Sequence, residues 1–459
     1  MSGRAHEAGA IHGDFGHRGP AWLGTPKDVN ALMPLLWPQT VHKGAGGVLN
    51  IGGLDVTELA AEFGTPVYLL DEEDMRARCR AFNTAFDKAE VFYAGKAFLC
   101  KAIVRILIEE GLSLDVCSGG ELATALAAGM DPVRIGFHGN NKSMSELKRA
   151  VDAGIGRIIV DSDDEIERLT SFNQRVPVML RVTVGVEAHT HEFIATAHED
   201  QKFGFALAGG MAFEAAKRIL SEGVLDLKGF HSHIGSQIFD ASGFEVSARR
   251  VLSLQRRVRD ELGVELPELD LGGGFGIAYT SQDDPSPAGD LADRMFKIVT
   301  DECAALSLAQ PHLSVEPGRA IVGPSTFTLY EVGTVKPLDG LRTYVSVDGG
   351  MSDNIRTALY DASYSATLAS RISAAEPMLA RVVGKHCESG DVVVKDEFLP
   401  ADIKAGDLLA VPGTGAYCRS MASNYNHVPR PPVVAVRDGQ ARVIVRRETE
   451  DDLLALDVG

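Results

Sequence analysis

The stretch from Val91 to Lys101, VFYAGKAFLCK, determines how we divide this chain. Its first half is a short apolar run typical of a buried strand, and apolar residues then recur at the spacing of one helix face. Lys96 lies where the first pattern gives way to the second. A lysine held at such a junction loses part of its solvation, which lowers the pKa of its amine and makes it nucleophilic. Lys96 is therefore a candidate for binding an aldehyde as a Schiff base, although on this stretch alone a solvated loop lysine is the favoured interpretation.

From this stretch onward, short apolar strands alternate with amphipathic helices. Eight strands are predicted, ending near Ala94, Val116, Phe137, Val160, Val182, His233, Leu271 and Val315. Eight strand–helix units predict an α/β fold, a (β/α)8 or TIM barrel, whose active site lies at the carboxyl ends of its strands. The polar stretch after Val182 is expected to be a loop insertion, in which the histidines are solvated: His189, His191 and His198.

Several helix boundaries are marked by their capping residues. The pairs Ser143/Glu146 and Ser162/Glu165 have the spacing of capping boxes, in which each side chain satisfies a backbone amide of the first turn. Gly129 and Gly154 are predicted to end helices.

The chain outside the barrel has a different pattern. Beyond Lys336 strand signals dominate, and Asp438-Gly439 between alternating apolar residues predicts a hairpin. We expect a flexible arm over residues 1–25, a segment at 26–70 that joins the β domain, the cofactor-binding barrel at 71–336 and an all-β domain at 337–459. The chain thus leaves one domain, builds the barrel and returns.

Composition excludes several classes of protein. The formal charge of −18 and the isoelectric point near 5.2 argue against a nucleic-acid surface, which needs clustered Lys and Arg. No apolar segment approaches the length that spans a bilayer, and no secretion signal is visible. The six cysteines form no CxxC pair, so neither a disulfide framework nor a zinc knuckle is indicated. We predict a cytoplasmic protein without a membrane or nucleic-acid partner.

Three more strand ends carry unusual chemistry. His231 and His233 in HSHIGSQ are two residues apart and face one side of a strand, and LDLGGGFGI offers consecutive glycines whose amides can surround a phosphate. VEPGRAIVG adds Glu316 and Arg319. An amine, a flat imidazole, a phosphate loop and a carboxylate are together what pyridoxal 5'-phosphate requires. The histidine pair could instead hold a metal, but that interpretation leaves Lys96 and Glu316 unexplained, and we predict no metal.

The motifs YAGKA, DVCSGGE, HSHIGSQ, GGGFG, EPGR, SDNIRTALY, HCESGD and GTGAYC, in this order, closely resemble the diaminopimelate decarboxylase family, which consists of fold-type III pyridoxal-phosphate decarboxylases. The resemblance covers roughly residues 47 to 430. It implies that Lys96 is the Schiff-base lysine, that His233 stacks on the cofactor ring and that Glu316 meets the pyridine nitrogen. The residues that it assigns to the phosphate are Ser236, Gly273, Gly274, and Glu316, Pro317, Gly318 and Arg319 of the EPGR turn.

The same resemblance implies a substrate site. Arg319, Arg356 and Tyr360 would bind a distal carboxylate and Glu388 a distal amine, while Tyr417 would contact both cofactor and substrate. Cys387 would return a proton to the carbanion. In this family Cys387 and Glu388 come from the second subunit, so a homodimer with shared sites is expected.

The resemblance implies decarboxylation of meso-2,6-diaminopimelate to L-lysine and CO2, the last step of lysine biosynthesis. One alternative is a decarboxylase of ornithine or arginine, whose cationic tails a pocket with two arginines would repel. Another is a non-catalytic pyridoxal-phosphate binding protein, which has no need of HCESGD or of the long β domain. The chain departs from the family pattern at Ile355 and Thr357, where prolines are expected, and at Asp361, where glycine is expected.

Overall fold

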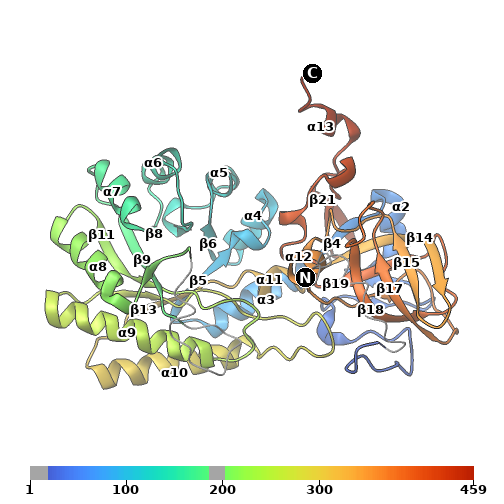
Figure 1. Ribbon diagram of the computed structural model, residues 1–459, viewed down its shortest axis with the longest axis horizontal. Helices are drawn as coiled ribbons and strands as arrows, with labels where there is room; N and C mark the ends of the chain where they lie inside the picture. The colour runs from blue at the N-terminus through green and yellow to red at the C-terminus, as the bar shows by residue number, and fades with distance from the viewer. Residues whose placement is uncertain (1–18, 186–201) are drawn as a thin grey trace, which may run out of the picture. The chain divides into compact units, whose positions relative to one another are not determined.

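The computed structural model describes residues 19–185 and 202–459, which form two compact units (Figure 1). The barrel unit comprises Arg76–Gly276 and Pro285–Ile321. The β unit comprises the described residues up to Met75, Ile277–Asp284 and Val322–Gly459. Most of the predicted arm at 1–25 lies outside the described residues, as do His189, His191 and His198.

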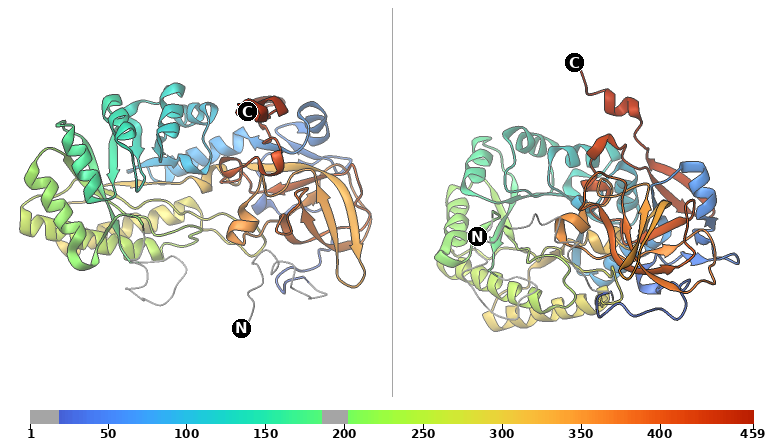
Figure 2. Two further views of the ribbon diagram at one scale, coloured as in Figure 1. Left: turned by 45° about the horizontal axis from the view of Figure 1, so that its top comes forward. Right: turned by 45° about the vertical axis from the view of Figure 1, so that its right-hand side comes forward.

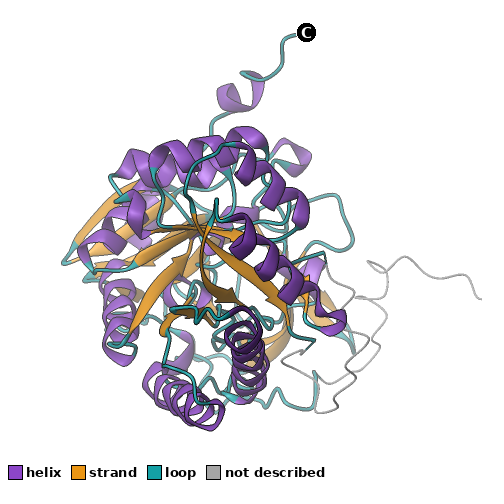
Figure 3. Cartoon of the chain, turned by 90° about the vertical axis from the view of Figure 1, so that its left-hand side faces the viewer, coloured by secondary structure: helices purple, strands orange, loops and turns teal. Residues whose placement is uncertain are grey.

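Eight parallel strands close into the predicted barrel. They are β5 (Ala89–Ala94), β6 (Ser113–Val116), β7 (Ile135–Phe137), β8 (Arg157–Val160), β9 (Pro177–Thr183), β11 (Asp226–His231), β12 (Glu268–Asp270) and β13 (His312–Val315). The ring closes because β13 pairs with β5, where Val315 lies opposite Val91. A short strand, β10 (Phe205–Ala206), pairs in parallel with the end of β9. Helices surround the strands, so the (β/α)8 prediction is confirmed (Figure 3).

The helices of this part of the chain follow the strands in the order that the sequence predicts. They are α3 (Glu72–Ala85), α4 (Lys101–Glu109), α5 (Gly119–Ala128), α6 (Met144–Ala153), α7 (Asp163–Ser171), α8 (Met211–Glu222), α9 (Ser242–Leu262), α10 (Ala288–Leu306) and α11 (Arg319–Val322), with 3-10 turns η2 (Gly95–Ala97), η3 (Pro132–Arg134) and η4 (Ala208–Gly210). The two longest, α9 and α10, lie side by side outside the barrel (Figure 2). None of the described helices combines the length and apolar content that a membrane span needs.

The first predicted capping box is present. Ser143 accepts from the backbone amide of Glu146, and the Glu146 carboxylate accepts from the backbone amide of Ser143. Gly129 and Gly154 end their helices with φ angles of 94° and 68°. These left-handed conformations favour glycine, as the sequence predicted.

The second predicted box is only half formed. Ser162 accepts from the amide of Glu165, but the Glu165 carboxylate bonds elsewhere, to Nζ of Lys142 at 2.6 Å and to the amide of Asp161 at 3.0 Å. Lys142 is 2% exposed. A buried ammonium needs a carboxylate partner more than a helix end does, which explains the difference from the prediction.

The β unit is mostly sheet, with short helices. Its strands are β1 (His42–Lys43), β2 (Leu49–Ile51), β3 (Leu54–Asp55), β4 (Val67–Asp71), β14 (Thr326–Leu338), β15 (Arg342–Val347), β16 (Thr367–Leu368), β17 (Pro377–Val383), β18 (Val392–Pro400), β19 (Leu408–Pro412), β20 (Val433–Arg437) and β21 (Gln440–Val445). Its helices are α2 (Val56–Phe63), α12 (Arg356–Tyr360) and α13 (Glu450–Leu454), with 3-10 turns η1 (Pro34–Leu36), η5 (Arg419–Met421) and η6 (Tyr425–His427). Asp438 and Gly439, with φ of 51° and 70°, form the predicted hairpin turn between β20 and β21.

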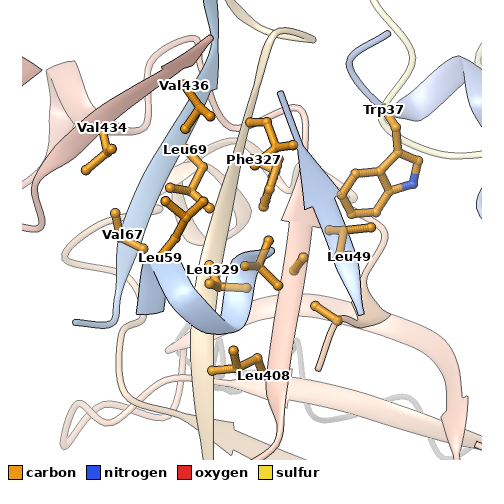
Figure 4. Close-up of a cluster of buried hydrophobic side chains, with 14 of the residues drawn as sticks. Trp37, Leu49, Leu59, Val67, Leu69, Phe327, Leu329, Leu408, Val434 and Val436 are labelled. Carbon is orange, nitrogen blue, oxygen red and sulfur yellow. The ribbon is translucent and has the colours of Figure 1, made fainter. Parts of the chain in front are cut away.

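The early segment of the chain is built into this unit. Strand β4 lies between β14, to which it is antiparallel, and β20, to which it is parallel. The core around it combines residues from both ends of the chain (Figure 4), and Trp37 packs edge-on against Phe327 with 5.6 Å between ring centroids. The fold prediction of a barrel with a second sheet domain that includes an N-terminal segment is confirmed.

Candidate active site

Lys96 follows the first barrel strand directly. Strand β5 ends at Ala94, and the chain then makes the single 3-10 turn η2, which contains Lys96. Gly95 and Ala97 are buried, whereas Lys96 is exposed. The expectation that this lysine is partly desolvated is therefore wrong for the described structure, because the turn directs the side chain out of the packed layer and leaves the amine accessible.

A cluster of acids and histidines lies buried at the carboxyl ends of four strands. Oε1 of Glu316 is 3.1 Å from Nε2 of His138 and 3.0 Å from Nε2 of His231. Nε2 of His138 is also 3.2 Å from Oδ1 of Asp115. All four residues are less than 9% exposed. One imidazole thus lies between two carboxylates, and one carboxylate lies between two imidazoles.

The cluster keeps Glu316 ionised. Burial by itself raises the pKa of Glu316, but the adjacent His138 and His231 outweigh burial and hold that pKa well below its usual range. Burial lowers the pKa of His138, but Glu316 and Asp115 raise it further, to about 10. Burial lowers the pKa of His231 to about 4. His138 is therefore the cation of the cluster at neutral pH, and His231 is neutral.

His233 has a different environment from His231, although the two are only two residues apart. Nδ1 of His233 accepts from the backbone amide of Gly273 at 3.4 Å. Burial and then the charge of Lys96 hold the pKa of His233 well below its usual range. The one group of three or more possible metal ligands found among the described residues combines His231 with His138 and Glu316 and does not include His233. His233 instead presents a neutral, half-buried ring.

The glycine-rich loop after β12 passes very close to its neighbours. A Cβ at Gly273 would lie 2.3 Å from the carbonyl oxygen of Glu316, and one at Gly274 would lie 2.5 Å from that of Gly235. Gly274 also has a φ of 105°, which side chains rarely adopt. Beside this loop, Nη2 of Arg319 donates to Oγ of Ser236 at 2.7 Å. The loop therefore requires glycine, and the serine and the arginine are hydrogen-bonded to each other.

These residues fit pyridoxal 5'-phosphate. The barrel unit supplies an accessible amine, a neutral flat ring, a glycine loop with a cation and an ionised carboxylate. Oε1 of Glu316 and Nε2 of His231 are buried without a well-aligned hydrogen-bond partner in the described part of the chain. Glu316 as a whole keeps 7% of its surface exposed.

Asp115 and His138 are not among the site residues predicted from the sequence. Both lie at barrel strand ends, Asp115 as the penultimate residue of β6 and His138 directly after β7. The rule that barrel active sites collect at these ends could have identified them. Their roles were hidden because each pairs with Glu316 or with the other across strands rather than within a motif.

The β unit contains Arg356, which is buried without an acidic partner. Arg356 is 6% exposed, and no carboxylate lies within ion-pair distance of it among residues 19–185 and 202–459. Nη1 of Arg356 donates to the hydroxyl of Tyr364 at 2.5 Å, and its guanidinium lies 4.8 Å from the ring centroid of Tyr279. Tyr360, one helical turn later, is 60% exposed. A buried cation of this kind is a ready site for an external carboxylate.

The departures from the family pattern are compensated by other contacts. Thr357 donates its hydroxyl proton to the carbonyl oxygen of Val393 at 3.0 Å. Asp361 adopts φ of 54°, the conformation that glycine favours, and Lys395 binds both its carboxylate and, at 2.6 Å, its carbonyl oxygen. The backbone around Arg356 is thus held by side-chain bonds.

The remaining predicted residues of the β unit lie on turns. Cys387 and Glu388 are exposed, in a loop anchored by Asp391, whose carboxylate accepts from the amides of His386 at 2.8 Å and of Met351 at 2.6 Å. Tyr417 is half-buried and has φ of 67°.

Comparison with known proteins identifies the family. Residues 72–323 match the family model described as the pyridoxal-dependent decarboxylase, pyridoxal binding domain. The chain is 56% identical over 440 residues to the diaminopimelate decarboxylase of Mycobacterium tuberculosis, covering 93% of this chain and 98% of that protein. The chain belongs to the diaminopimelate decarboxylase family.

Other members of the family are similar over nearly their whole length. The diaminopimelate decarboxylase of Bacillus subtilis is 46% identical over 427 residues, which are 91% of this chain and 97% of that protein. The crystal structure of the M. jannaschii diaminopimelate decarboxylase, a complex with L-lysine, has a TM-score of 0.86 and 32% identity and covers 92% of this chain and 98% of that one. The predicted family resemblance is therefore confirmed.

Proposed function

We propose that this chain decarboxylates meso-2,6-diaminopimelate to L-lysine and CO2, the last step of lysine biosynthesis, with pyridoxal 5'-phosphate as cofactor. The observation that carries the proposal is the position of Glu316, whose carboxylate lies 3.1 Å and 3.0 Å from two buried histidines at the barrel end that also bears Lys96 and the glycine loop. Bound pyridoxal phosphate supplies an electron sink for the pair that CO2 leaves behind.

Each barrel residue has a proposed part in binding the cofactor. Lys96 attaches the cofactor through its accessible amine, and Glu316 holds a proton at the pyridine nitrogen, because an ionised carboxylate stabilises the protonated ring. His233 packs its neutral ring against the cofactor. The phosphate is assigned to Ser236, Gly273, Gly274, Pro317, Gly318 and Arg319. His138 stays positively charged and keeps Glu316 ionised, as its distance of 3.1 Å supports.

The substrate roles are proposed on charge. Arg356 and Arg319 bind the distal carboxylate by forked hydrogen bonds, Tyr360 adds a neutral donor, and Glu388 accepts from the distal ammonium. Tyr417 contacts cofactor and substrate. The absence of a protein carboxylate near Arg356 in the described residues supports this assignment, because ornithine and arginine bring no distal carboxylate to such a site.

We further propose a homodimer in the cytoplasm, in which Cys387 and Glu388 complete the site of the partner. Their exposure in an anchored loop supports this role, and Cys387 would return the proton to the substrate carbon. The six cysteines, all in the described residues, form no disulfide bond with one another, which fits a reducing compartment.

A substrate panel tests the proposal. Cofactor-loaded protein is mixed with meso-diaminopimelate, L-lysine, ornithine or arginine, and CO2 release is measured. We expect release from diaminopimelate and at least 100-fold less, on the order of the discrimination seen for a missing polar group, from the others. A Lys96→Ala variant is the control for cofactor-dependent release. Equal release from ornithine or arginine would overturn the proposal.

A further inference from the structure

A closed circuit of hydrogen bonds surrounds Arg356. Nη1 of Arg356 donates to the Tyr364 hydroxyl at 2.5 Å, and this hydroxyl lies 3.6 Å from Sγ of Cys418. The Cys418 thiol donates to Oδ1 of Asn354 at 3.5 Å, and the same oxygen accepts from the backbone amide of Arg356 at 3.3 Å. The circuit therefore begins at the side chain of Arg356 and returns to its backbone.

Hydrogen-bond donation runs in one direction around the circuit. A guanidinium only donates, so the Tyr364 oxygen accepts, and the phenol proton is left for the sulfur of Cys418. Burial, and after it the neighbouring Cys418, raise the pKa of Tyr364 well above its usual value, so the phenol keeps its proton. The thiol proton then goes to Asn354. Each of these three donors thus has an acceptor within the circuit, which restricts the rotamer of Arg356.

The rest of the guanidinium is left available. Tyr364 is the one hydrogen-bond acceptor of this side chain within the described part of the chain, so four of its five donors are left for a ligand. The rings of Tyr279 and Tyr364 meet edge to face, with centroids 5.1 Å apart, and the guanidinium lies 4.8 Å and 5.6 Å from them. The faces of the rings attract the cation. An acidic partner would neutralise its charge, whereas the rings do not.

We propose that Tyr364 is a positioning residue that aims Arg356 at the distal carboxylate of the substrate and so sets the preference for substrates that carry one. This role rests on the proposed function and adds a determinant of specificity to it. Tyr364 does not touch the reacting carbon. Its effect should therefore appear in substrate binding and not in the chemical step.

The experiment compares two ligands in one assay with Tyr364→Phe, which keeps the ring and removes the hydroxyl. We expect KM for diaminopimelate to rise about tenfold with kcat changed less than about twofold, the behaviour of a lost uniform binding interaction. The inhibition constant of 1,5-diaminopentane, which lacks the distal carboxylate that diaminopimelate and the product L-lysine both carry, should not change. Tyr344→Phe removes a phenol from β15 of the same unit and should leave both constants unchanged.

Variants of Cys418 provide an independent test. Cys418→Ala opens the circuit and should raise KM for diaminopimelate, whereas Cys418→Ser keeps a donor and an acceptor and should restore it. Thermal unfolding of each cofactor-loaded variant is measured alongside. If Tyr364→Phe does not fold, the comparison of alanine with serine decides the question.

The outcomes separate the two proposals. An unchanged KM in Tyr364→Phe, or a KM and a 1,5-diaminopentane inhibition constant that rise together, would overturn the role of Tyr364. Equal KM values for Cys418→Ala and Cys418→Ser would do the same. A wild-type enzyme that releases no CO2 from diaminopimelate would instead refute the proposed function.

Discussion

Replacing His138 by glutamine removes the positive charge between two buried carboxylates and nearly preserves the shape. Nε2 of His138 is 3.1 Å from Glu316 and 3.2 Å from Asp115, and both contacts are buried. Without this charge, burial and mutual repulsion favour the protonated form of Glu316. A protonated Glu316 cannot stabilise a proton on the pyridine nitrogen, so we expect the variant to bind the cofactor and to lose activity, most strongly at acid pH.

The size of the expected shift in the pH profile follows from the distance between His138 and Glu316. At an effective dielectric constant of about 20, two unit charges 3.1 Å apart interact by about 5 kcal/mol, and breaking a buried pair typically costs roughly 3–5 kcal/mol. A change of about 1.4 kcal/mol already moves a titration by one pH unit. The acid limb of kcat/KM should therefore move to higher pH by at least one unit, roughly a tenfold loss at pH values on that limb.

The free energy of unfolding should depend on pH in the alkaline range, whereas the activity depends on pH in the acid range. The pKa of His138 is raised from 6.5 to about 10, so its contribution is complete below 6.5 and is lost as pH rises through 10. Wild-type stability should therefore fall between these values, and the slope should flatten in His138→Gln. Glu316, whose pKa is lowered, contributes above its ordinary value of 4.5 and loses this contribution as pH falls.

Two measurements on cofactor-loaded protein test this reasoning: pH profiles of kcat/KM, and urea unfolding from pH 6.5 to 10. His312→Gln is the matched control, because His312 is exposed at the start of β13, the strand that leads to Glu316. The reasoning is refuted if His138→Gln keeps the wild-type acid limb while its kcat/KM is unchanged.

Three further predictions follow from the site. Mixing inactive Lys96→Ala with inactive Cys387→Ala chains should restore up to about a quarter of wild-type activity in exchanged dimers, and no recovery after proven exchange would place each site within one chain. Arg356→Lys should lower kcat/KM for diaminopimelate about tenfold or more with the absorbance of the bound cofactor unchanged, because an ammonium cannot form the fork. Lys395→Ala should raise KM in the wild-type background but have little effect in Asp361→Gly, and equal effects in both would contradict their coupling.

The barrel was predictable because its signals are local. Each strand is a short apolar run, the helices after β6, β7 and β8 begin at a capping serine, and five of the eight predicted strand ends agree with the structure to the residue. Lys96, His233 and Glu316 could be proposed for the same reason, since each lies at or just beyond a strand end in a motif with recognisable chemistry. The residues next to a strand end are enough to show which side chains lie at that end.

The electrostatics of the site were not predictable in this way. His138 becomes a cation only because Glu316 and Asp115 converge on it from other strands, while His231, equally buried, is neutral. The exposure of Lys96 also depends on a single turn that the apolar pattern does not resolve. Charge and solvation are properties of distant neighbours, and residue type alone does not give them.

The segment around Arg356 shows how far apart cause and effect can lie in the sequence. Thr357 and Asp361 look like defects in a proline- and glycine-containing pattern, because one lacks a fixed φ and the other must adopt a left-handed conformation. The partners that stabilise them, the Val393 carbonyl and the Lys395 ammonium, both lie on β18 and more than 30 residues later. A proline or glycine shapes the backbone by itself, whereas these substitutes do so only when β18 is in place. The geometry of Arg356 in this chain is therefore a tertiary property, and the specificity we assign to it depends on the packing of α12 against β18.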